Sequence, residues 1–522
     1  MADSGADDDR GPTRSVEVER KFRVHGLFRL PEISLADGGG LGDGTLTVLT
    51  AAYLDTADLR LARSRVTLRR REGGSDEGWH LKLPLRAEAR EELTVPLDRG
   101  TTTAPPQELS DLALSLSRSA PLENVATLRT ERTTYPVLDA SGAPLASLTD
   151  DSVSVLDGGR TVAQFREIEV ELVDGDDAVL DEVGGLLTRA GALPGGNVSK
   201  VGRALGPLAT ADPDVPEPGE VRPHDPARLA VQAHLARNTR ALLLHDVGVR
   251  RDAPDAVHQM RVAARRLRSG LKVFEPLLDP TVTRPLRSEL AWLAGVLGEV
   301  RDREVLRDRL LRDLERISTD PAVEFDTTAA RRLVRSSMTT GMTGARVAVL
   351  AALRSERYLA LLDDLVRTCA APPVVGAAEA PCSEALPPLV RKAWRRLERD
   401  VEALRPDGPD AEWHETRIAA KRARYACEAV EPVFGKPARR LAARVELVTE
   451  LLGEHQDAAL AADTVRALAG RKQLAGSTGF ALGILHSLQR EAVDASRDEL
   501  VRIWPEVSRR HWRVWLRPQG AR

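Results

Sequence analysis

The chain has little of several residue types that mark common classes of protein. Only 3% of its 522 residues are aromatic, which leaves few stacking platforms of the kind that hold single-stranded nucleic acid. The three cysteines, Cys369, Cys382 and Cys427, show neither the spacing of a disulfide framework nor a Cys-x-x-Cys motif. We therefore expect reduced, buried thiols at these positions. No apolar run reaches membrane-spanning length, and the first 14 residues are acidic and polar, unlike a signal peptide. We therefore expect a cytoplasmic protein without a membrane partner.

Net charge divides the chain into two parts. The total is near neutral, with 75 basic and 78 acidic residues and a formal net charge of −3. Residues 1–220 nevertheless carry a net charge of −14, and residues 221–522 carry +11. The junction is rich in proline and acidic residues, which is typical of a linker. We predict a first domain at residues 14–206, a linker at 207–223 and a second domain at 224–516.

Glutamate alternates with other residues near the start of the first domain. In a strand, successive side chains point to opposite faces, so Glu17, Glu19 and Lys21 share one face. Two carboxylates and an amine are poor for a core, but they suit a site that holds a divalent metal through carboxylate oxygens and an anion through the amine. A solvated strand face would carry the same pattern, so the motif needs support from the rest of the domain.

Further charged residues follow a period of two along the first 205 residues, in short β-type segments. A sheet face rich in both cations and carboxylates would be costly if dry. It makes sense in a barrel whose lumen is wet, where carboxylates hold Mg²⁺ or Mn²⁺ and cations hold a polyanion. The segments contribute Arg69, Arg71, Lys82, Arg90, Glu92, Arg129, Arg132, Glu167, Glu169, Glu171 and Lys200.

These motifs resemble those of a known superfamily. The pattern Glu17-x-Glu19-x-Lys21, the later charged strands and the segment Tyr53–Leu59 are similar to the CYTH superfamily, also called triphosphate tunnel metalloenzymes. The resemblance covers about residues 14–206. It implies an eight-stranded antiparallel β-tunnel, and members hydrolyse inorganic triphosphate or thiamine triphosphate, or cyclise ATP.

The same resemblance implies roles for the tunnel residues. The catalytic set would be Glu17, Glu19 and Lys21, and the metal ligands would be Glu17, Glu19, Glu169 and Glu171. One carboxylate would orient or deprotonate the attacking water, and which glutamate does so stays open. Two alternatives remain for Lys200. It closes one end of the tunnel, or it is a surface lysine at the start of a helix. The triphosphate would be bound by Lys21, Arg69, Arg71, Lys82, Arg90, Arg129, Arg132 and Lys200.

The second part has helical periodicity nearly throughout and contains an internal repeat. Each copy begins with a histidine, His258 or His414, followed by basic residues at the same three offsets. Each copy later reaches a matching turn, whose aspartate lies 44 residues after the first histidine (Asp302) and 43 after the second (Asp457). The two copies therefore predict two related helical bundles.

The offsets place the basic residues of each copy on one helix face, at roughly 100° per residue. A stripe of cations without an anion repels itself, so we favour an anion-binding groove over a solvated or salt-bridged basic face. Asp302 and Asp457 would orient basic residues through ion pairs. The stripes are His258, Arg261, Arg265 and Arg268 in the first copy, and His414, Arg417, Lys421 and Arg424 in the second.

This part resembles the CHAD domain family, a helical module marked by such histidines and often fused behind a CYTH domain. The match spans about residues 222–515. It implies two pseudo-symmetric helical bundles, here at about 224–370 and 388–516, with a basic surface that binds inorganic polyphosphate. Contacts from Arg and Lys to phosphate carry no sequence information, so sequence-specific nucleic acid is not an expected partner.

Together these patterns predict an α+β multidomain protein, a β-tunnel followed by an all-α domain. The predicted function is metal-dependent hydrolysis of inorganic triphosphate or a related linear triphosphate, with polyphosphate bound by the helical domain. An adenylate cyclase or a thiamine triphosphatase of the same superfamily is an alternative. A non-catalytic polyphosphate-binding protein with a degenerate tunnel is another, although the intact glutamate sets argue against it.

Overall fold

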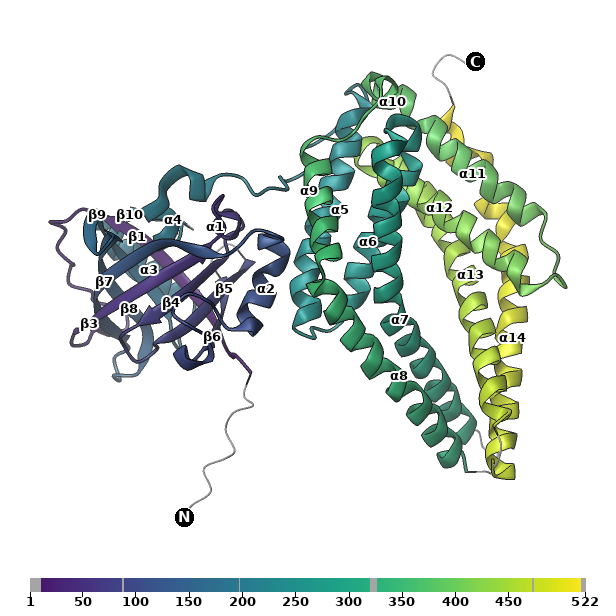
Figure 1. The fold of residues 1–522 in the computed structure, drawn as a ribbon, viewed down its shortest axis with the longest axis horizontal. Coiled ribbons are helices and arrows are strands. Elements are labelled where there is room, and N and C mark those ends of the chain that lie inside the picture. Colours follow the sequence, from purple (N-terminus) through teal and green to yellow (C-terminus); the bar gives the residue numbers. More distant parts are fainter. Residues whose placement is uncertain (1–10, 87–88, 197, 320–325, 472–473, 518–522) are drawn as a thin grey trace. The chain divides into compact units, whose positions relative to one another are not determined.

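The chain forms two compact units, Met1–Asp214 and Val215–Arg522, the first built on strands and the second on helices (Figure 1). None of the helices in the described part of the chain is long and apolar enough to cross a membrane. The structure is a computed structural model, and it describes residues 11–86, 89–196, 198–319, 326–471 and 474–517.

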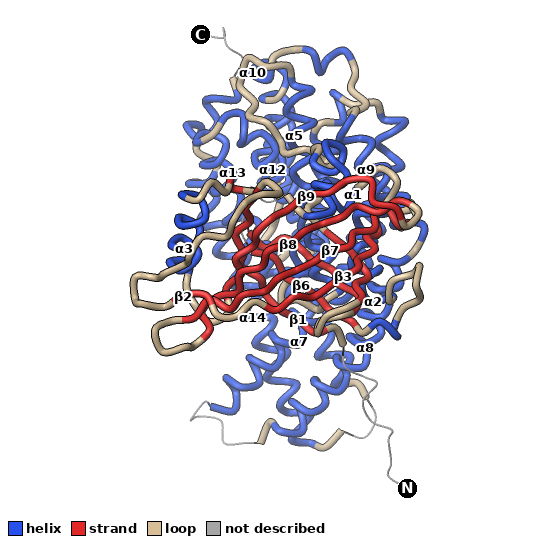
Figure 2. The backbone as a smooth tube through the Cα atoms, turned by 90° about the vertical axis from the view of Figure 1, so that its left-hand side faces the viewer, coloured by secondary structure: helices blue, strands red, loops and turns tan. Residues whose placement is uncertain are grey.

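Eight antiparallel strands of the first unit close into a barrel (Figure 2). They are β1 (Thr13–Val24), β3 (Thr45–Asp55), β4 (Thr67–Glu72), β5 (Gly78–Arg86), β6 (Ala89–Val95), β7 (Glu123–Leu138), β8 (Pro144–Asp157) and β9 (Arg160–Leu172). The order around the barrel is β1, β6, β5, β4, β3, β7, β8 and β9, and β9 pairs back with β1. The predicted eight-stranded antiparallel tunnel is therefore confirmed. Two short strands pair at the periphery, β2 (Gly40–Leu41) with β7 and β10 (Leu193–Pro194) with β1.

The outer face of the barrel is partly covered by helix α3 (Asp177–Arg189). Phe22, Ile168 and Val170 point outward and pack with Leu180 and other residues of α3. Gly184 of α3 permits a close approach, because a Cβ there would lie 3.0 Å from the ring of Phe22. Since side chains alternate along a strand, burying these apolar residues outside directs their charged neighbours into the lumen.

One end of the lumen is closed by the short helix α4 (Lys200–Leu205). Ser199 caps this helix, and its hydroxyl accepts a hydrogen bond of 3.1 Å from the amide of Gly202. Val201 packs among lumen-facing apolar residues that include Tyr53 and Leu128. The cap and this packing fix the first helical residue, Lys200, at the lumen. The other helices of the unit are α1 (Arg60–Arg63), α2 (Gln107–Ser117) and the 3₁₀ helices η1 (Leu97–Arg99) and η2 (Gly206–Thr210).

Part of the predicted linker is held to the first unit. It begins within η2, and the carboxylate of Asp214 lies 2.7 Å from Arg63 and also pairs with Arg118. The division between the two units falls directly after Asp214. An acidic residue of this segment thus makes specific contacts with the first unit.

The second unit consists of helices in two successive groups. The first group is α5 (Ala227–Arg250), α6 (Ala256–Val273), α7 (Pro280–Thr319), α8 (Thr328–Arg354) and α9 (Glu356–Ala370). After the short α10 (Cys382–Ala385), the second group is α11 (Pro387–Glu402), α12 (Asp410–Phe434), α13 (Lys436–Ala469) and α14 (Gly476–Val507). Three 3₁₀ helices complete the unit: η3 (Glu275–Leu277), η4 (Gly376–Glu379) and η5 (Arg510–Leu516).

The two repeat motifs lie on α6 and α12, which pack against each other. On α6, Met260, Leu267 and Leu271 recur at helical spacing and are fully buried. Trp394 and Trp413 fill the core of the second group. Burial of one side of each repeat helix leaves the basic side away from the core. The three cysteines are unpaired and buried, as expected.

Candidate active site and anion-binding groove

Strand β1 brings its three predicted residues into the lumen opposite charged partners. Glu17 is paired in register with Arg90 of β6. Glu19 lies opposite Glu171, and Lys21 lies opposite Glu169, both on β9. Residues directly opposite on neighbouring strands share a face of the sheet, so both strands project their charges into the same lumen.

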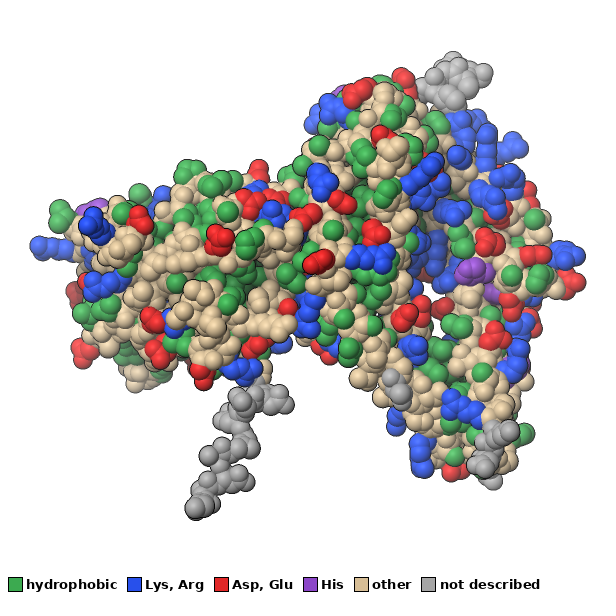
Figure 3. All heavy atoms as spheres, viewed as in Figure 1, with side chains coloured by type: hydrophobic (Ala, Val, Ile, Leu, Met, Phe, Trp, Pro, Cys, Tyr) green, Lys and Arg blue, Asp and Glu red, His purple; other side chains and the backbone are tan. Residues whose placement is uncertain are grey.

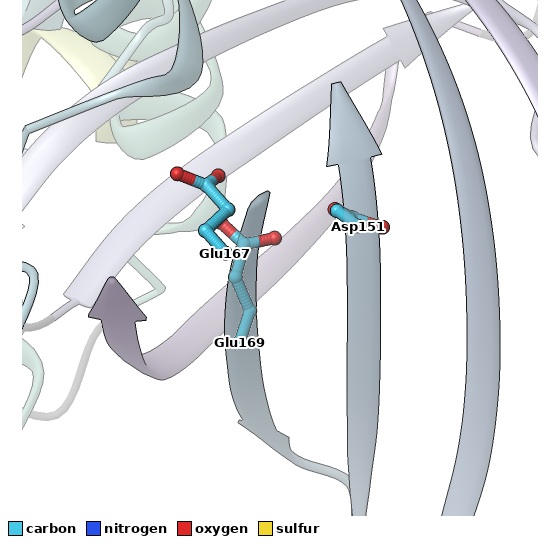
Figure 4. Close-up of side chains that lie close together, drawn as sticks. All are labelled: Asp151, Glu167 and Glu169. Atoms are coloured by element: carbon cyan, nitrogen blue, oxygen red, sulfur yellow. The ribbon is translucent and has the colours of Figure 1, made fainter. Parts of the chain in front are cut away.

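Three buried carboxylates form a compact group in the lumen (Figure 4). Asp151 lies on β8, and Glu167 and Glu169 lie on β9. One oxygen from each side chain lies within 4.8 Å of the others. Like charges this close repel strongly in a buried place, so the group requires a cation.

Lys200 supplies a cation to this group. Its ammonium lies 3.0 Å from Asp151, 2.9 Å from Glu167 and 2.5 Å from Glu169. Burial opposes the charged amine, but the three carboxylates outweigh this effect and raise the pKa of Lys200 well above its usual value. Carboxylate oxygens are also the ligands that Mg²⁺ and Mn²⁺ prefer. The donor set therefore fits a divalent metal, with Lys200 as a stand-in cation.

Two further cations surround the carboxylate group. The Lys21 ammonium lies 2.5 Å from Glu169 and 3.0 Å from Glu19. The Arg132 guanidinium donates two hydrogen bonds to Asp151, of 2.8 and 2.7 Å, and lies 3.3 Å from Glu169. A lysine and a bidentate arginine beside the carboxylates are suited to bind phosphate oxygens at the same place.

A second set of charges occupies another part of the lumen. Lys82 lies 2.5 Å from Glu17 and 3.4 Å from Glu92. Glu92 also lies 3.0 Å from the Nδ1 atom of His80 and 3.4 Å from Arg69. Burial lowers the pKa of His80 to about 4, so this histidine is neutral near pH 7. The set thus combines fixed cations with a neutral imidazole.

Glu171 has an unusual protonation equilibrium. Burial first, and then the charge of Glu17, raises its pKa to about 7, with Glu19 and Glu169 adding to the effect. A carboxylate that titrates near neutral pH can accept or release a proton during a reaction. Glu171 is therefore a candidate general base in the lumen.

The helical unit carries a basic groove with a volume of about 960 Å³. Four helices form its walls. In the space-filling view of Figure 3, blue side chains gather in the hollow of this unit. The cationic lining is Arg261, Arg265, Arg268 and Lys272 from α6, Arg284 and Arg287 from α7, Lys392 and Arg396 from α11, and Lys421 and Arg422 from α12.

Several groove cations have no compensating charge. Within the described residues, Arg268 and Lys421 form no ion pair, and the one carboxylate in the lining is Glu275. Burial, followed by repulsion from Arg265 and Arg417, lowers the pKa of Lys421 to about 7. A bound anion would offset both the burial of these cations and their mutual repulsion, so the lining favours binding of an anion.

The sequence comparisons agree with this division into two units. The CYTH domain family matches residues 15–205, and the CHAD domain family matches residues 233–466. An uncharacterized protein of Mycobacterium tuberculosis (strain ATCC 25618 / H37Rv) is 34% identical over 514 residues, covering 94% of this chain and 96% of that protein. The chain belongs to the CYTH–CHAD family.

Two solved structures are also similar to parts of the chain. PptA from Streptomyces chartreusis is 29% identical, with a TM-score of 0.47, and the match covers 54% of this chain and 99% of that one. A putative adenylyl cyclase from Hippeastrum, described as having a dominant triphosphatase activity, is 16% identical with a TM-score of 0.20. That match covers 37% of this chain and 98% of the Hippeastrum chain. Membership of the family rests on the domain matches and on the full-length relative.

Most residues predicted for the CYTH site do face one lumen. The set brought together is Glu17, Glu19, Lys21, Arg69, Arg71, Lys82, Arg90, Arg132, Glu169, Glu171 and Lys200. Arg129 is a correction: it lies on the outer face, half exposed, 3.5 Å from Glu131. Three positions separate Arg129 from Arg132, and an odd spacing in a strand puts two side chains on opposite faces.

Within the predicted metal ligands, the structure separates two groups. Glu169 belongs to the compact carboxylate group, whereas Glu17, Glu19 and Glu171 do not. Glu19 nevertheless borders the group, because the Lys21 ammonium contacts both Glu19 and Glu169. The predicted metal set omitted Asp151 and Glu167. Both lie on strands with alternating charge, so period two could have marked them. Glu167 shares a strand face with Glu169, but the closeness of Asp151 to the two glutamates depends on the pairing of β8 with β9.

In the CHAD domain, half of the predicted stripe lines the groove. Arg261, Arg265, Arg268 and Lys421 do so, and the other four lie outside its described walls. His414 hydrogen bonds with Gln456 over 2.6 Å, and Arg424 pairs with Glu428 at 2.7 Å.

Both aspartates expected to form ion pairs do so. Asp302 lies 2.7 Å from Arg261, and Asp457 lies 3.9 Å from Arg417. The cations of α7 and α11 were missed, because they lie outside the repeat motif.

Proposed function

We propose that the CYTH domain hydrolyses a linear triphosphate, with inorganic triphosphate as its substrate, using Mg²⁺ or Mn²⁺, and that the CHAD domain binds inorganic polyphosphate. The observation that carries the enzymatic part is the group of three buried carboxylates with Lys21 and Arg132 beside it. An enclosed site with both signs of charge complements a polyanion that arrives together with a metal.

The residues that would hold the metal are Asp151, Glu167 and Glu169. When bound, it would neutralise phosphate oxygens and stabilise the charge that develops on the terminal phosphoryl group. Lys200, which contacts the same three carboxylates, would then be available to donate hydrogen bonds to a phosphate oxygen. The compact carboxylate group would thus contact the Lys200 ammonium in the absence of metal and would bind the metal ion when it is present.

The remaining lumen residues would bind and orient the substrate. Lys21 and Arg132 would donate to phosphate oxygens near the metal, and Lys82 and Arg69 would do so further along the chain of phosphates. An oxygen of Glu171 would accept the proton of the attacking water, because its pKa of about 7 matches a base that works near neutral pH.

The polyphosphate part of the proposal is supported by the unpaired cations of the CHAD groove. Arg268, Lys421 and Arg422 have no carboxylate partner among the described residues, and blue side chains gather in the hollow of this unit in Figure 3. A flexible polyanion would pair with these cations and would release counterions as it binds. Its affinity would therefore fall as the salt concentration rises.

The test is phosphate release from inorganic triphosphate, ATP and thiamine triphosphate, with Mg²⁺, with Mn²⁺ and with a chelator. We expect metal-dependent release from inorganic triphosphate, which Glu169→Gln abolishes. Glu131→Gln is the matched control, because Glu131 lies on the outer face of the barrel. Formation of cyclic AMP from ATP without phosphate release from triphosphate would contradict the proposal, as would full activity of Glu169→Gln.

A further inference from the structure

Helix α11 carries a strip of cations that extends beyond the groove. Lys392 lines the groove and also an adjoining hollow of about 600 Å³, together with Arg395 and Arg399. Arg391 and Arg395 line both this hollow and the next one, of about 310 Å³, which reaches η5 and Arg517. Because the hollows share walls, they form one continuous surface from the groove across α11 to the end of η5. In Figure 3, blue side chains also gather in the region where Figure 1 labels α11.

The acidic residues on this surface are already neutralised. Glu398 lies 2.9 Å from Arg513, and Glu275 in the groove lies 2.5 Å from Lys272 and 3.3 Å from Arg287. Lys392 and Arg395, in contrast, have no carboxylate partner within the described part of the chain. The guanidinium of Arg399 donates to the backbone carbonyl of Arg395, a contact that leaves its charge uncompensated. The strip therefore has a surplus of positive charge.

The spacing of these cations is unfavourable for a helix by itself. Arg391, Arg395 and Arg399 follow one another at intervals of four, which places like charges next to each other on the helix surface. Arg391 has a structural role, because its guanidinium donates a hydrogen bond to the backbone carbonyl of Leu516. Packing does not require Arg395 and Arg399, which are exposed, because α11 buries its other side through Val390, Trp394 and Leu397. A solvated face built only for stability would alternate the signs of charge at this spacing.

We propose that this strip, Lys392, Arg395 and Arg399 with the cations of η5, continues the anion-binding surface of the groove, so that a long polyphosphate chain passes from the groove over α11. The inference rests on the proposed binding of polyphosphate by the CHAD domain. It adds that affinity increases with chain length, because a chain longer than the groove gains contacts on α11. Each further phosphate contact releases counterions, so long chains have the steeper salt dependence.

The test compares two chain lengths on full-length protein, with the double variant Arg395→Glu and Arg399→Glu. The control is Arg316→Glu with Arg466→Glu, which makes the same change in charge at exposed arginines of α7 and α13 outside the strip. Binding of chains of about ten and about one hundred phosphates is measured at several salt concentrations, since the slope reports the number of contacts.

We expect the α11 variant to lose about tenfold or more in affinity for the long chain, with a shallower salt slope, and less than about twofold for the short chain. Equal losses for both lengths, or no loss for the long chain, would overturn the extension while leaving the groove as a binding site. Absence of binding to wild-type protein at both lengths would overturn the proposed function itself.

Two additional measurements check that the loss of affinity comes from the α11 cations and that the ligand is polyphosphate. The neutral variant Arg395→Gln with Arg399→Gln should show the same dependence on length with a smaller loss, and thermal unfolding checks that each variant folds. Single-stranded RNA of matched length is tested in parallel. Tighter binding of RNA than of polyphosphate, removed by the double substitution, would overturn the assignment of the strip to polyphosphate.

Discussion

The lumen of the CYTH domain and the groove of the CHAD domain are both rich in arginine and lysine, but they differ in how many of these cations are paired with carboxylates. In the lumen, Lys21, Lys82 and Lys200 each lie within 3.0 Å of a carboxylate. In the groove, Arg268 and Lys421 form no ion pair among the described residues. The lumen therefore holds nearly as much negative as positive charge, and the groove holds an excess of positive charge.

Under the proposed function, this difference would separate a reaction site from a binding surface. A buried network of paired charges holds each group in a fixed position, which catalysis requires, and its carboxylates provide ligands for a metal. A groove with an excess of cations would need neither a metal nor fixed geometry, and it would accept chains of different length. The predictions below test this contrast, beginning with the largest expected effect.

Removal of divalent metal should affect only the tunnel. With a chelator, hydrolysis of inorganic triphosphate should fall by about a thousandfold or more, because the substrate charge is no longer neutralised at the carboxylate group. Affinity of the same protein for polyphosphate should stay within about twofold, since the groove binds through side chains alone. Phosphate release and polyphosphate binding are measured on one preparation. A large loss of polyphosphate binding with chelator would break the comparison.

Charge reversal in the groove should produce the opposite result. Arg265→Glu together with Lys421→Glu should weaken polyphosphate binding by about a hundredfold and flatten its salt dependence. Hydrolysis of inorganic triphosphate should be unchanged, because both residues lie in the CHAD domain. The variant Arg316→Glu with Arg466→Glu again serves as the control. If that control lost as much affinity, only the overall charge of the domain would matter.

Removing the stand-in cation should make the tunnel bind metal more tightly. Lys200→Met leaves three close carboxylates without the ammonium that contacts them, so their repulsion should favour a divalent ion. In the absence of substrate, we expect about a tenfold higher affinity for Mn²⁺, measured by electron paramagnetic resonance. Lys200→Arg, which keeps the charge, should retain weak binding. Unchanged affinity in Lys200→Met would show that Lys200 and the metal do not compete.

The smallest predicted effect concerns pH and the groove. The pKa of Lys421 is lowered to about 7, so the fraction of Lys421 that is protonated falls as the pH rises through this value. Because a bound polyanion favours the charged amine, polyphosphate affinity should decrease by about threefold between pH 6.5 and 7.5, with uptake of a proton on binding. Calorimetry in buffers of different ionisation enthalpy measures this uptake.

The variant Lys421→Arg isolates that effect. Its guanidinium stays protonated over the whole range, while His258 and His414 are retained, so the affinity should lose most of its pH dependence. The same pH dependence in wild type and variant would assign the titration to another group. Hydrolysis in the tunnel gives no information on this point, because the lumen has its own titrating group in Glu171.

Several parts of the site could be predicted from the sequence because they depend on local periodicity. Alternation along one strand places Glu17, Glu19 and Lys21 on the same face, independently of how the strands pair in the barrel. Repetition at helical spacing places Arg261, Arg265 and Arg268 on one side of α6. The same rule, applied to the odd spacing between Arg129 and Arg132, would have removed Arg129 from the tunnel set.

Other parts could not be predicted, because they depend on contacts between distant segments. Asp151 and Glu169 become neighbours through the register of β8 with β9. The pairing of Lys200 with these carboxylates depends on where α4 closes the barrel, after the last long strand. The strip on α11 has no counterpart in the repeat motif, and only the shared walls of the hollows join it to the groove.

The sequence by itself determined the two-part organisation, the charge split, the strand faces of the tunnel and the basic faces of the repeat helices. These follow from composition and from periods of two and 3.6 residues, which act over a few residues at a time. Only the tertiary structure decided which charges neutralise one another. In the closed barrel, burial forces Lys200 onto three carboxylates, whereas in the groove the facing helices bring cations together and leave Lys421 without a partner among the described residues. Burial and mutual distance, which set the energy of a charge, exist only once the chain has folded.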